Sequence, residues 1–154
     1  MFVAAAGPSP IVDEPARRAA VRALIVDPHD DTRELYREAL EGDGLMVTHA
    51  ATLGEGLHIV VTEHPAVVST ELRFEDGDGL EFCRHLRASA DTSHIPIVIV
   101  TAETRPARLA DAREIANAVF IKPCPPEAYA TVMRKIAAGG RMGALRAAHP
   151  RSIR

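Results

Sequence analysis

The sequence lacks the long apolar segments and cysteine patterns that mark membrane and secreted proteins. None of its apolar runs approaches the ~20 residues that a membrane-spanning helix needs. The N-terminus reaches Pro8 and Pro10 without a preceding basic segment, which is not the pattern of a signal peptide. Only two cysteines occur, Cys83 and Cys124, so we expect no disulfide framework and a protein that works in the reducing cytoplasm.

Motifs for common cofactors and for catalysis are also missing. Neither Gly42-Asp43-Gly44 nor Gly77-Asp78-Gly79 has the third glycine of a dinucleotide fingerprint, and no Walker A motif occurs. The seven histidines show no paired helical spacing for zinc. Cys124 lacks the arginine of a Cys-x5-Arg phosphatase motif, because that position is Ala130, and we interpret Cys124 as a packing residue. With no visible nucleophile–base pair, we expect a protein that is not an enzyme.

The charge balance gives little reason to expect a nucleic acid or membrane partner. The formal net charge of the 154 residues is −3. Residues 129–154 are an exception, since they contain no acid and carry Arg134, Lys135, Arg141, Arg146, Arg151 and Arg154. A basic arm can contact phosphates, so nucleic acid binding through this tail stays as an alternative function. The segment has no interleaved aromatic residues, and a solvated helix face followed by a flexible tail is the favoured interpretation.

Short apolar runs alternate with helical patterns along most of the chain. The runs cover residues 22–26, 45–48, 67–70, 95–100 and 119–121. Helical patterns follow them, beginning near Asp31, Thr52, Leu80, Pro106 and Pro125. Because the runs are continuously apolar, they predict parallel strands covered on both faces, in an α/β doubly wound fold.

The same pattern sets the expected domain limits and helix starts. We expect a flexible N-terminal arm over residues 1–20, one domain over 21–138, and a basic flexible tail over 139–154. Asp31 with Glu34, and Thr52 with Glu55, fit the capping-box pattern at the starts of the first two helices.

Four polar residues end the apolar runs: Asp27, Glu71, Thr101 and Lys122. In a doubly wound sheet, binding sites lie beyond the carboxyl ends of the strands. We therefore expect these four side chains to meet in one acidic pocket.

Four motifs within residues 22–138 carry a resemblance to a known family. They are Asp30-Asp31-Thr32-Arg33-Glu34-Leu35, Asp78-Gly79-Leu80-Glu81, Ile97-Val98-Ile99-Val100-Thr101-Ala102 and Lys122-Pro123-Cys124-Pro125. With the four polar residues, they make the chain similar to the receiver domain of bacterial response regulators in two-component systems. The resemblance implies a flavodoxin-like (βα)5 three-layer sandwich with a five-stranded parallel sheet of order 2-1-3-4-5.

The resemblance also implies roles for the polar residues. Glu71 stands at the position of the aspartate that accepts a phosphoryl group in the family, and Asp27 belongs to its acidic pocket. Thr101 and Lys122 match the residues that respond to the phosphorylated acid. The family usually has a second acid after the first strand, which helps to bind Mg²⁺, and here that position is Pro28. We therefore expect no resident metal, with Asp27 and Glu71 as weak candidate ligands for Mg²⁺.

These departures favour a receiver that does not depend on phosphorylation. The additional methylene of Glu71 moves the carboxylate by ~1.5 Å, and an error near 1 Å can cost about a hundredfold in rate. Glu71 would then either imitate the phosphorylated acid or be inert. A working phosphoacceptor regulator is the alternative within the family.

The expected mode of action is binding to another protein, namely a histidine kinase, an output protein or another signalling protein. Family members often use the fourth helix, fifth strand and fifth helix, here about residues 106–138, and a homodimer would form through the same surface. The family often has an aromatic switch residue three positions before the lysine, where this chain has Val119. Phe120 is adjacent, and we expect it in the core.

Overall fold

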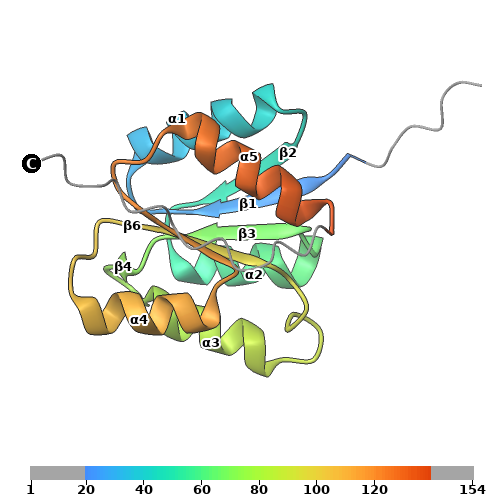
Figure 1. Ribbon diagram of the computed structural model, residues 1–154. Coiled ribbons are helices and arrows are strands. Elements are labelled where there is room, and N and C mark those ends of the chain that lie inside the picture. Colours follow the sequence, from blue (N-terminus) through green and yellow to red (C-terminus); the bar gives the residue numbers. More distant parts are fainter. Residues whose placement is uncertain (1–19, 140–154) are drawn as a thin grey trace, which may run out of the picture.

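The computed structural model describes residues 20–139 (Figure 1). The predicted N-terminal arm, apart from its last residue, and all but the first residue of the predicted tail lie outside the described residues. Their assignment stays a prediction. Within residues 20–139, none of the helices has the length and apolar character needed to cross a membrane.

A five-stranded parallel sheet forms the middle layer, as the apolar runs predicted. Its strands, in spatial order, are β2 (Met46–Ala50), β1 (Arg22–Val26), β3 (Val67–Thr70), β6 (Ile97–Thr101) and β7 (Ala118–Ile121). This is the predicted order 2-1-3-4-5. Val26 is paired with both Ala50 and Thr70, so the carboxyl ends of the three neighbouring strands are level.

Five helices cover the two faces of the sheet. One face carries α1 (Asp30–Gly42) and α5 (Pro126–Ala137), and the other carries α2 (Leu53–Glu63), α3 (Gly79–Ala88) and α4 (Pro106–Ile115) (Figure 1). Successive residues of a strand point to opposite faces. In β1, Leu24 and Val26 accordingly pack toward α2 and α3, whereas Ala23 and Ile25 pack toward α1 and α5. The strands are therefore buried from both sides, and this explains why their sequences are continuously apolar.

A short antiparallel hairpin follows β3. It consists of β4 (Arg73–Phe74) and β5 (Gly77–Asp78). Its turn residue Asp76 accepts the backbone N–H groups of Leu53 and Gly54 at the start of α2, each at 3.2 Å. Strands of two residues are too short to produce a visible alternation of apolar and polar residues, so the sequence could not indicate them.

The prediction for the start of α2 is confirmed. The Thr52 hydroxyl accepts the Glu55 N–H at 3.2 Å, and the Glu55 carboxylate turns back to accept the N–H of Ala51.

The capping box predicted for α1 is wrong. The helix begins at Asp30, and its N-cap residue His29 makes no side-chain capping bond. Instead, the Asp27 carboxylate accepts the His29 N–H at 2.8 Å, and Arg33 donates to the Asp27 carbonyl oxygen at 2.6 Å. Glu34 pairs with Arg37 rather than reaching back to the helix start.

Candidate functional site

The structure brings the four predicted polar residues to one edge of the sheet. Asp27, Glu71 and Lys122 directly follow β1, β3 and β7, and Thr101 is the last residue of β6. The Lys122 Nζ lies 2.8 Å from Asp27 Oδ2 and 3.0 Å from Glu71 Oε2, so one ammonium group joins both carboxylates. The order of the parallel strands places these carboxyl ends together.

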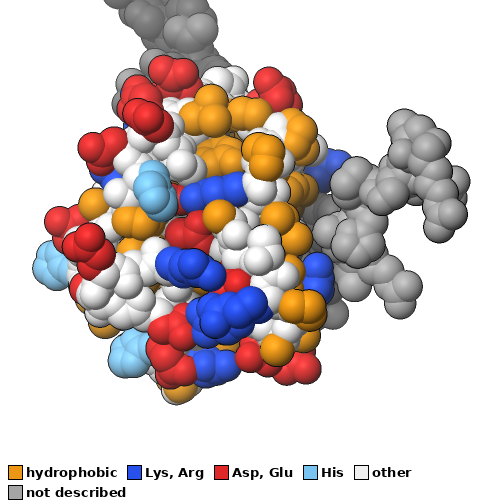
Figure 2. All heavy atoms as spheres, turned by 90° about the vertical axis from the view of Figure 1, so that its left-hand side faces the viewer, with side chains coloured by type: hydrophobic (Ala, Val, Ile, Leu, Met, Phe, Trp, Pro, Cys, Tyr) orange, Lys and Arg blue, Asp and Glu red, His pale blue; other side chains and the backbone are white. Residues whose placement is uncertain are grey.

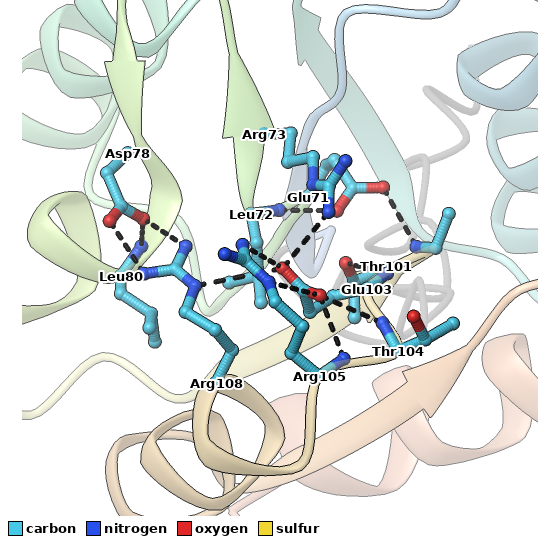
Figure 3. Close-up of polar contacts among 11 residues, drawn as sticks. Glu71, Leu72, Arg73, Asp78, Leu80, Thr101, Glu103, Thr104, Arg105 and Arg108 are labelled. Carbon is cyan, nitrogen blue, oxygen red and sulfur yellow. Dashed lines mark hydrogen bonds and ion pairs between the residues drawn. The ribbon is translucent and has the colours of Figure 1, made fainter.

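The Glu71 carboxylate is buried and fully engaged (Figure 3). Its Oε1 accepts the Leu72 N–H at 2.6 Å, and its Oε2 accepts the Ala102 N–H at 3.3 Å in addition to the ion pair with Lys122. Burial acts to raise the pKa of Glu71, but hydrogen bonds from the Thr101 hydroxyl, the Leu72 amide and Lys122 outweigh it and lower the pKa. The side chain is therefore ionised and points into the site rather than into solvent.

Both carboxylate oxygens of Asp27 have partners. Its Oδ1 accepts the His29 N–H and lies 3.2 Å from His29 Nδ1, while its Oδ2 binds Lys122. Burial acts to lower the pKa of Lys122, but the hydrogen bonds to Asp27 and Glu71 outweigh it and raise the pKa. Lys122 is therefore a cation shared by two buried anions.

Thr101 links the site to the loop that leads into α4. Its side chain is fully buried, and its Oγ1 accepts the Glu103 N–H at 3.0 Å. Because the next amide, that of Ala102, donates to Glu71, the beginning of this loop is attached directly to the Glu71 carboxylate.

The carboxylate oxygens at this edge have protein partners, which leaves Asp27 and Glu71 as poor ligands for a Mg²⁺ ion. All four carboxylate oxygens of Asp27 and Glu71 already accept hydrogen bonds from Lys122 or from nearby N–H groups. Pro28 lines the neighbouring cleft but offers no side-chain oxygen. Among residues 20–139, no group of three or more His, Cys, Asp or Glu side chains is arranged to hold a metal ion.

A third buried carboxylate, that of Glu103, was not predicted from the sequence. Its side chain has 0 % exposure and accepts the N–H groups of Thr104 and Arg105, each at 2.9 Å. Three guanidinium groups surround it, those of Arg73, Arg105 and Arg108, which we name the arginine cluster (Figure 3). These residues come from β4, the loop before α4, and α4 itself. The spacing of Arg105 and Arg108 places them one helical turn apart, but nothing in the sequence indicates that Glu103 is buried between them and Arg73.

Beside the site lies a cleft of about 830 Å³. Its walls combine the loop after β1, the start of α2, the hairpin β4–β5 and the start of the loop after β6. Its lining includes Pro28, Glu71, Arg73, Phe74, Glu75 and Asp76. The structure therefore places Glu71 and one member of the arginine cluster in the wall of a ligand-sized cavity.

Three other residues considered from the sequence, Cys124, Phe120 and Val119, pack against neighbouring side chains. Cys124 Sγ lies 3.0 Å from the Tyr36 hydroxyl, and burial raises the pKa of its thiol, which fits a packing role. Phe120 packs edge-on against Tyr129, with ring centroids 6.2 Å apart, as expected for a core residue. Val119 packs on the opposite face of the sheet.

Comparison with known proteins gives the same family through a family model and finds similar individual proteins. The family model for the response regulator receiver domain matches residues 23–134. The KDP operon transcriptional regulatory protein KdpE of Escherichia coli is 40% identical over 81 residues, which are 53% of this chain and 35% of that protein. An uncharacterized 14.6 kDa protein of Leptolyngbya boryana is 31% identical over 109 residues, which are 70% of this chain and 83% of that protein. The chain thus spans about a third of the length of KdpE.

Solved structures agree with the fold. A putative response regulator from Chloroflexus aurantiacus superimposes with a TM-score of 0.72 at 27% identity and covers 77% of this chain and 98% of that one. The chemotaxis response regulator CheY4 of Vibrio cholerae gives a TM-score of 0.69 at 23% identity, with 76% and 98% coverage. With its five-stranded sheet order and its gathered strand-end residues, this chain belongs to the response regulator receiver domain family.

Proposed function

We propose that this domain is a two-component signalling receiver whose conformation does not depend on phosphorylation. The observation that carries the proposal is the engagement of Glu71. Its carboxylate binds Lys122 and the Ala102 N–H, and Thr101 contributes to holding it ionised. In the family, Thr101 and Lys122 occupy the positions that respond to the phosphorylated acid. Here they already have an anionic partner on the chain itself.

The geometry also disfavours phosphoryl transfer to Glu71. Phosphoryl transfer depends almost wholly on positioning and on electrostatic stabilisation of the moving group. An attacking carboxylate oxygen must be free to approach phosphorus, whereas both oxygens of Glu71 accept hydrogen bonds from groups that the fold holds in place. In addition, the donor set beside it does not suit Mg²⁺, which neutralises charge in such reactions.

Glu71 is therefore a constitutive substitute for the modified acid, although a weaker one. A carboxylate carries one negative charge, compared with about 1.5 to 2 for a phosphoryl group near neutral pH. It satisfies Lys122 and draws the start of the β6–α4 loop toward β3 through the Ala102 amide. The loop is thereby held in one arrangement without a chemical signal.

The output of such a domain is a protein contact rather than a reaction, and we place it in the cytoplasm with other signalling proteins. The candidate partners are a histidine kinase, an output protein or another signalling protein. The surface of α4, β7 and α5 is the first candidate for this contact and for a homodimer. It adjoins the loop that Glu71 holds.

The direct test is incubation of the full chain with acetyl phosphate and Mg²⁺, followed by intact mass spectrometry. We expect no acid-labile mass increase corresponding to one phosphoryl group. A stoichiometric adduct that maps to Glu71 would refute the proposal. A receiver with the family aspartate, treated in parallel, shows that the reagent is active.

A further inference from the structure

The arginine cluster presents an unusual surface on an otherwise acidic domain. Residues 20–139 contain 12 Lys and Arg against 19 Asp and Glu, a formal charge of −7. Figure 2 shows the face formed by the carboxyl ends of the strands, where basic side chains gather near the middle and most acidic side chains lie toward the margin. Cations that are concentrated at one place on an anionic domain indicate a local preference for an anionic partner.

The buried Glu103 carboxylate pairs with the arginine cluster from below and leaves the guanidinium groups of Arg73 and Arg105 exposed at the surface. Hydrogen bonds from the Arg105 side chain, and then from backbone N–H groups, hold the pKa of Glu103 far below its usual range, so the carboxylate stays charged. It lies at 0 % exposure beneath the guanidinium groups, whereas the side chains of Arg73 and Arg105 are 67% and 62% exposed. An approaching molecule therefore meets exposed guanidinium groups that share one carboxylate beneath them.

Arg73 has the greatest remaining capacity to bind an anion. Its contact with Glu103 is long, at 3.4 Å, and it makes no other ion pair within residues 20–139. Arg108, by contrast, forms a two-pronged pair with Asp78, with both N–O distances at 2.8 Å. A guanidinium has five N–H donors, so Arg73 can bind a carboxylate side by side while keeping its contact with Glu103.

The cleft next to Arg73 adds an apolar component to this surface. Phe74 and Pro28 line it, together with four acidic residues, of which Glu71 and Glu103 are buried and already paired, whereas Glu75 and Asp76 lie at its rim. A ligand that suits both parts has an anionic group at Arg73 and Arg105 and an apolar group over Phe74. Because Glu75, Asp76 and the net charge of the domain repel a long polyanion, a nucleic acid fits this surface poorly. A short acidic segment of a protein brings its charges only to the guanidinium groups.

We propose that Arg73, Arg105 and the adjoining cleft form a docking site for an acidic segment of a partner protein that carries a bulky apolar residue. The inference rests on the proposed function in one respect, namely that the domain acts through protein contacts. The site lies at the carboxyl ends of the strands, beside Glu71, and Arg105 joins it to the start of α4.

The test uses a short fluorescent peptide with two adjacent glutamates and one phenylalanine among neutral residues, titrated with the full chain and followed by fluorescence anisotropy. The Arg73→Gln variant should weaken binding about fivefold, the scale of one exposed charge pair. Arg84→Gln is the matched control, because Arg84 is also exposed and pairs with one acid, Glu81, but lies on α3 outside the cleft. Replacing the phenylalanine by serine should weaken binding as well.

Several results would overturn this docking site. The first is absence of peptide binding, and the second is equal affinity of the wild-type chain and Arg73→Gln for the peptide. The third is an equal loss of affinity in Arg84→Gln, which would mean that the peptide is attracted by the charge of the domain and not by a specific site. If a single-stranded oligonucleotide of the same charge bound more tightly than the peptide, the partner of this site would be a nucleic acid rather than a protein segment. A phosphoryl adduct on Glu71 refutes the proposed function but leaves the comparison between Arg73→Gln and Arg84→Gln unchanged, so the two failures are distinguishable.

Discussion

The Nζ of Lys122 lies 3.0 Å from Oε2 of Glu71, although the two residues follow different strands of the sheet. The same ammonium also binds Asp27 at 2.8 Å. A lysine that would otherwise be available to a phosphoryl group is thus occupied by two carboxylates of the chain. Under the proposed function, this relationship takes the place of the contact that a phosphoryl group would make with Lys122.

Restoring the family's acids should restore phosphoryl acceptance. The double variant Pro28→Asp with Glu71→Asp shortens the acceptor and supplies the missing carboxylate. We expect it to gain a phosphoryl group from acetyl phosphate and Mg²⁺ at least about a hundredfold faster than the wild-type chain, because positioning errors near 1 Å carry that cost. Intact mass spectrometry over time measures the rate.

The matched control is Pro28→Asp with Glu71→Asn, which restores the same metal ligand without an acceptor. Equal labelling of the two double variants would mean that another residue accepts the group and that position 71 does not decide acceptance.

Removing Lys122 should destabilise the fold. In Lys122→Met, Asp27 and Glu71 remain as neighbouring buried carboxylates without their shared cation. Breaking a buried ion pair from one side costs about 3 kcal/mol, and we expect a loss of unfolding free energy of this size in urea denaturation.

Adding Glu71→Gln to Lys122→Met should recover part of this loss, because it removes one of the two unpaired charges. If the two single effects simply add in the double variant, the ion pair seen in the structure has no energetic coupling.

The stability of the domain should fall in acid through Glu103. In the folded chain the pKa of Glu103 lies below its ordinary value of 4.5, chiefly because the Arg105 side chain and nearby N–H groups donate to it. The unfolded chain therefore binds this proton more readily, so the contribution is complete above pH 4.5 and is lost as the pH falls toward the folded pKa. The pKa of Glu71 is lowered as well, with the same sign.

The measurement compares the wild-type chain with Glu103→Gln in urea at neutral pH and below about pH 4. The wild-type advantage in unfolding free energy should be largest at neutral pH and should shrink in acid. A difference that stays constant with pH would show that Glu103 contributes through packing alone.

Gly79 should not tolerate a side chain. A Cβ atom at this position would lie 2.1 Å from the Glu71 carbonyl oxygen and 2.7 Å from Leu72 Cα, both of which are backbone atoms. We expect Gly79→Ala to lower the unfolding free energy by at least about 2 kcal/mol, because the end of β3 must shift. Thermal or urea denaturation measures the loss.

Gly42→Ala is the control, since a Cβ there meets nothing within 4 Å. It should leave stability nearly unchanged or raise it by up to about 1 kcal/mol by restricting the unfolded chain. Equal behaviour of the two variants would contradict the close approach of Gly79 to β3.

Much of the fold could be predicted because its signals are local. The runs at Leu24, Val68 and Ile99 are continuously apolar, and only a sheet covered on both faces buries such runs. Once the strands are parallel, their carboxyl ends form one edge, and the gathering of Asp27, Glu71, Thr101 and Lys122 follows from that geometry. The strand order came from the family resemblance rather than from the runs themselves.

What the sequence by itself determined is therefore the layered sheet and which polar side chains reach its edge, since apolar periodicity and the direction of the strands dictate both. Only the tertiary structure decided what those side chains contact. The Glu71 carboxylate accepts the amides of Leu72 and Ala102, and Asp27 accepts the amide of His29. Glu103 is buried beneath the three arginines of the arginine cluster. The contacts of Glu71 with Ala102 and of Glu103 with Arg73 join segments about 30 residues apart, and their formation depends on loop paths that no local pattern of residues encodes.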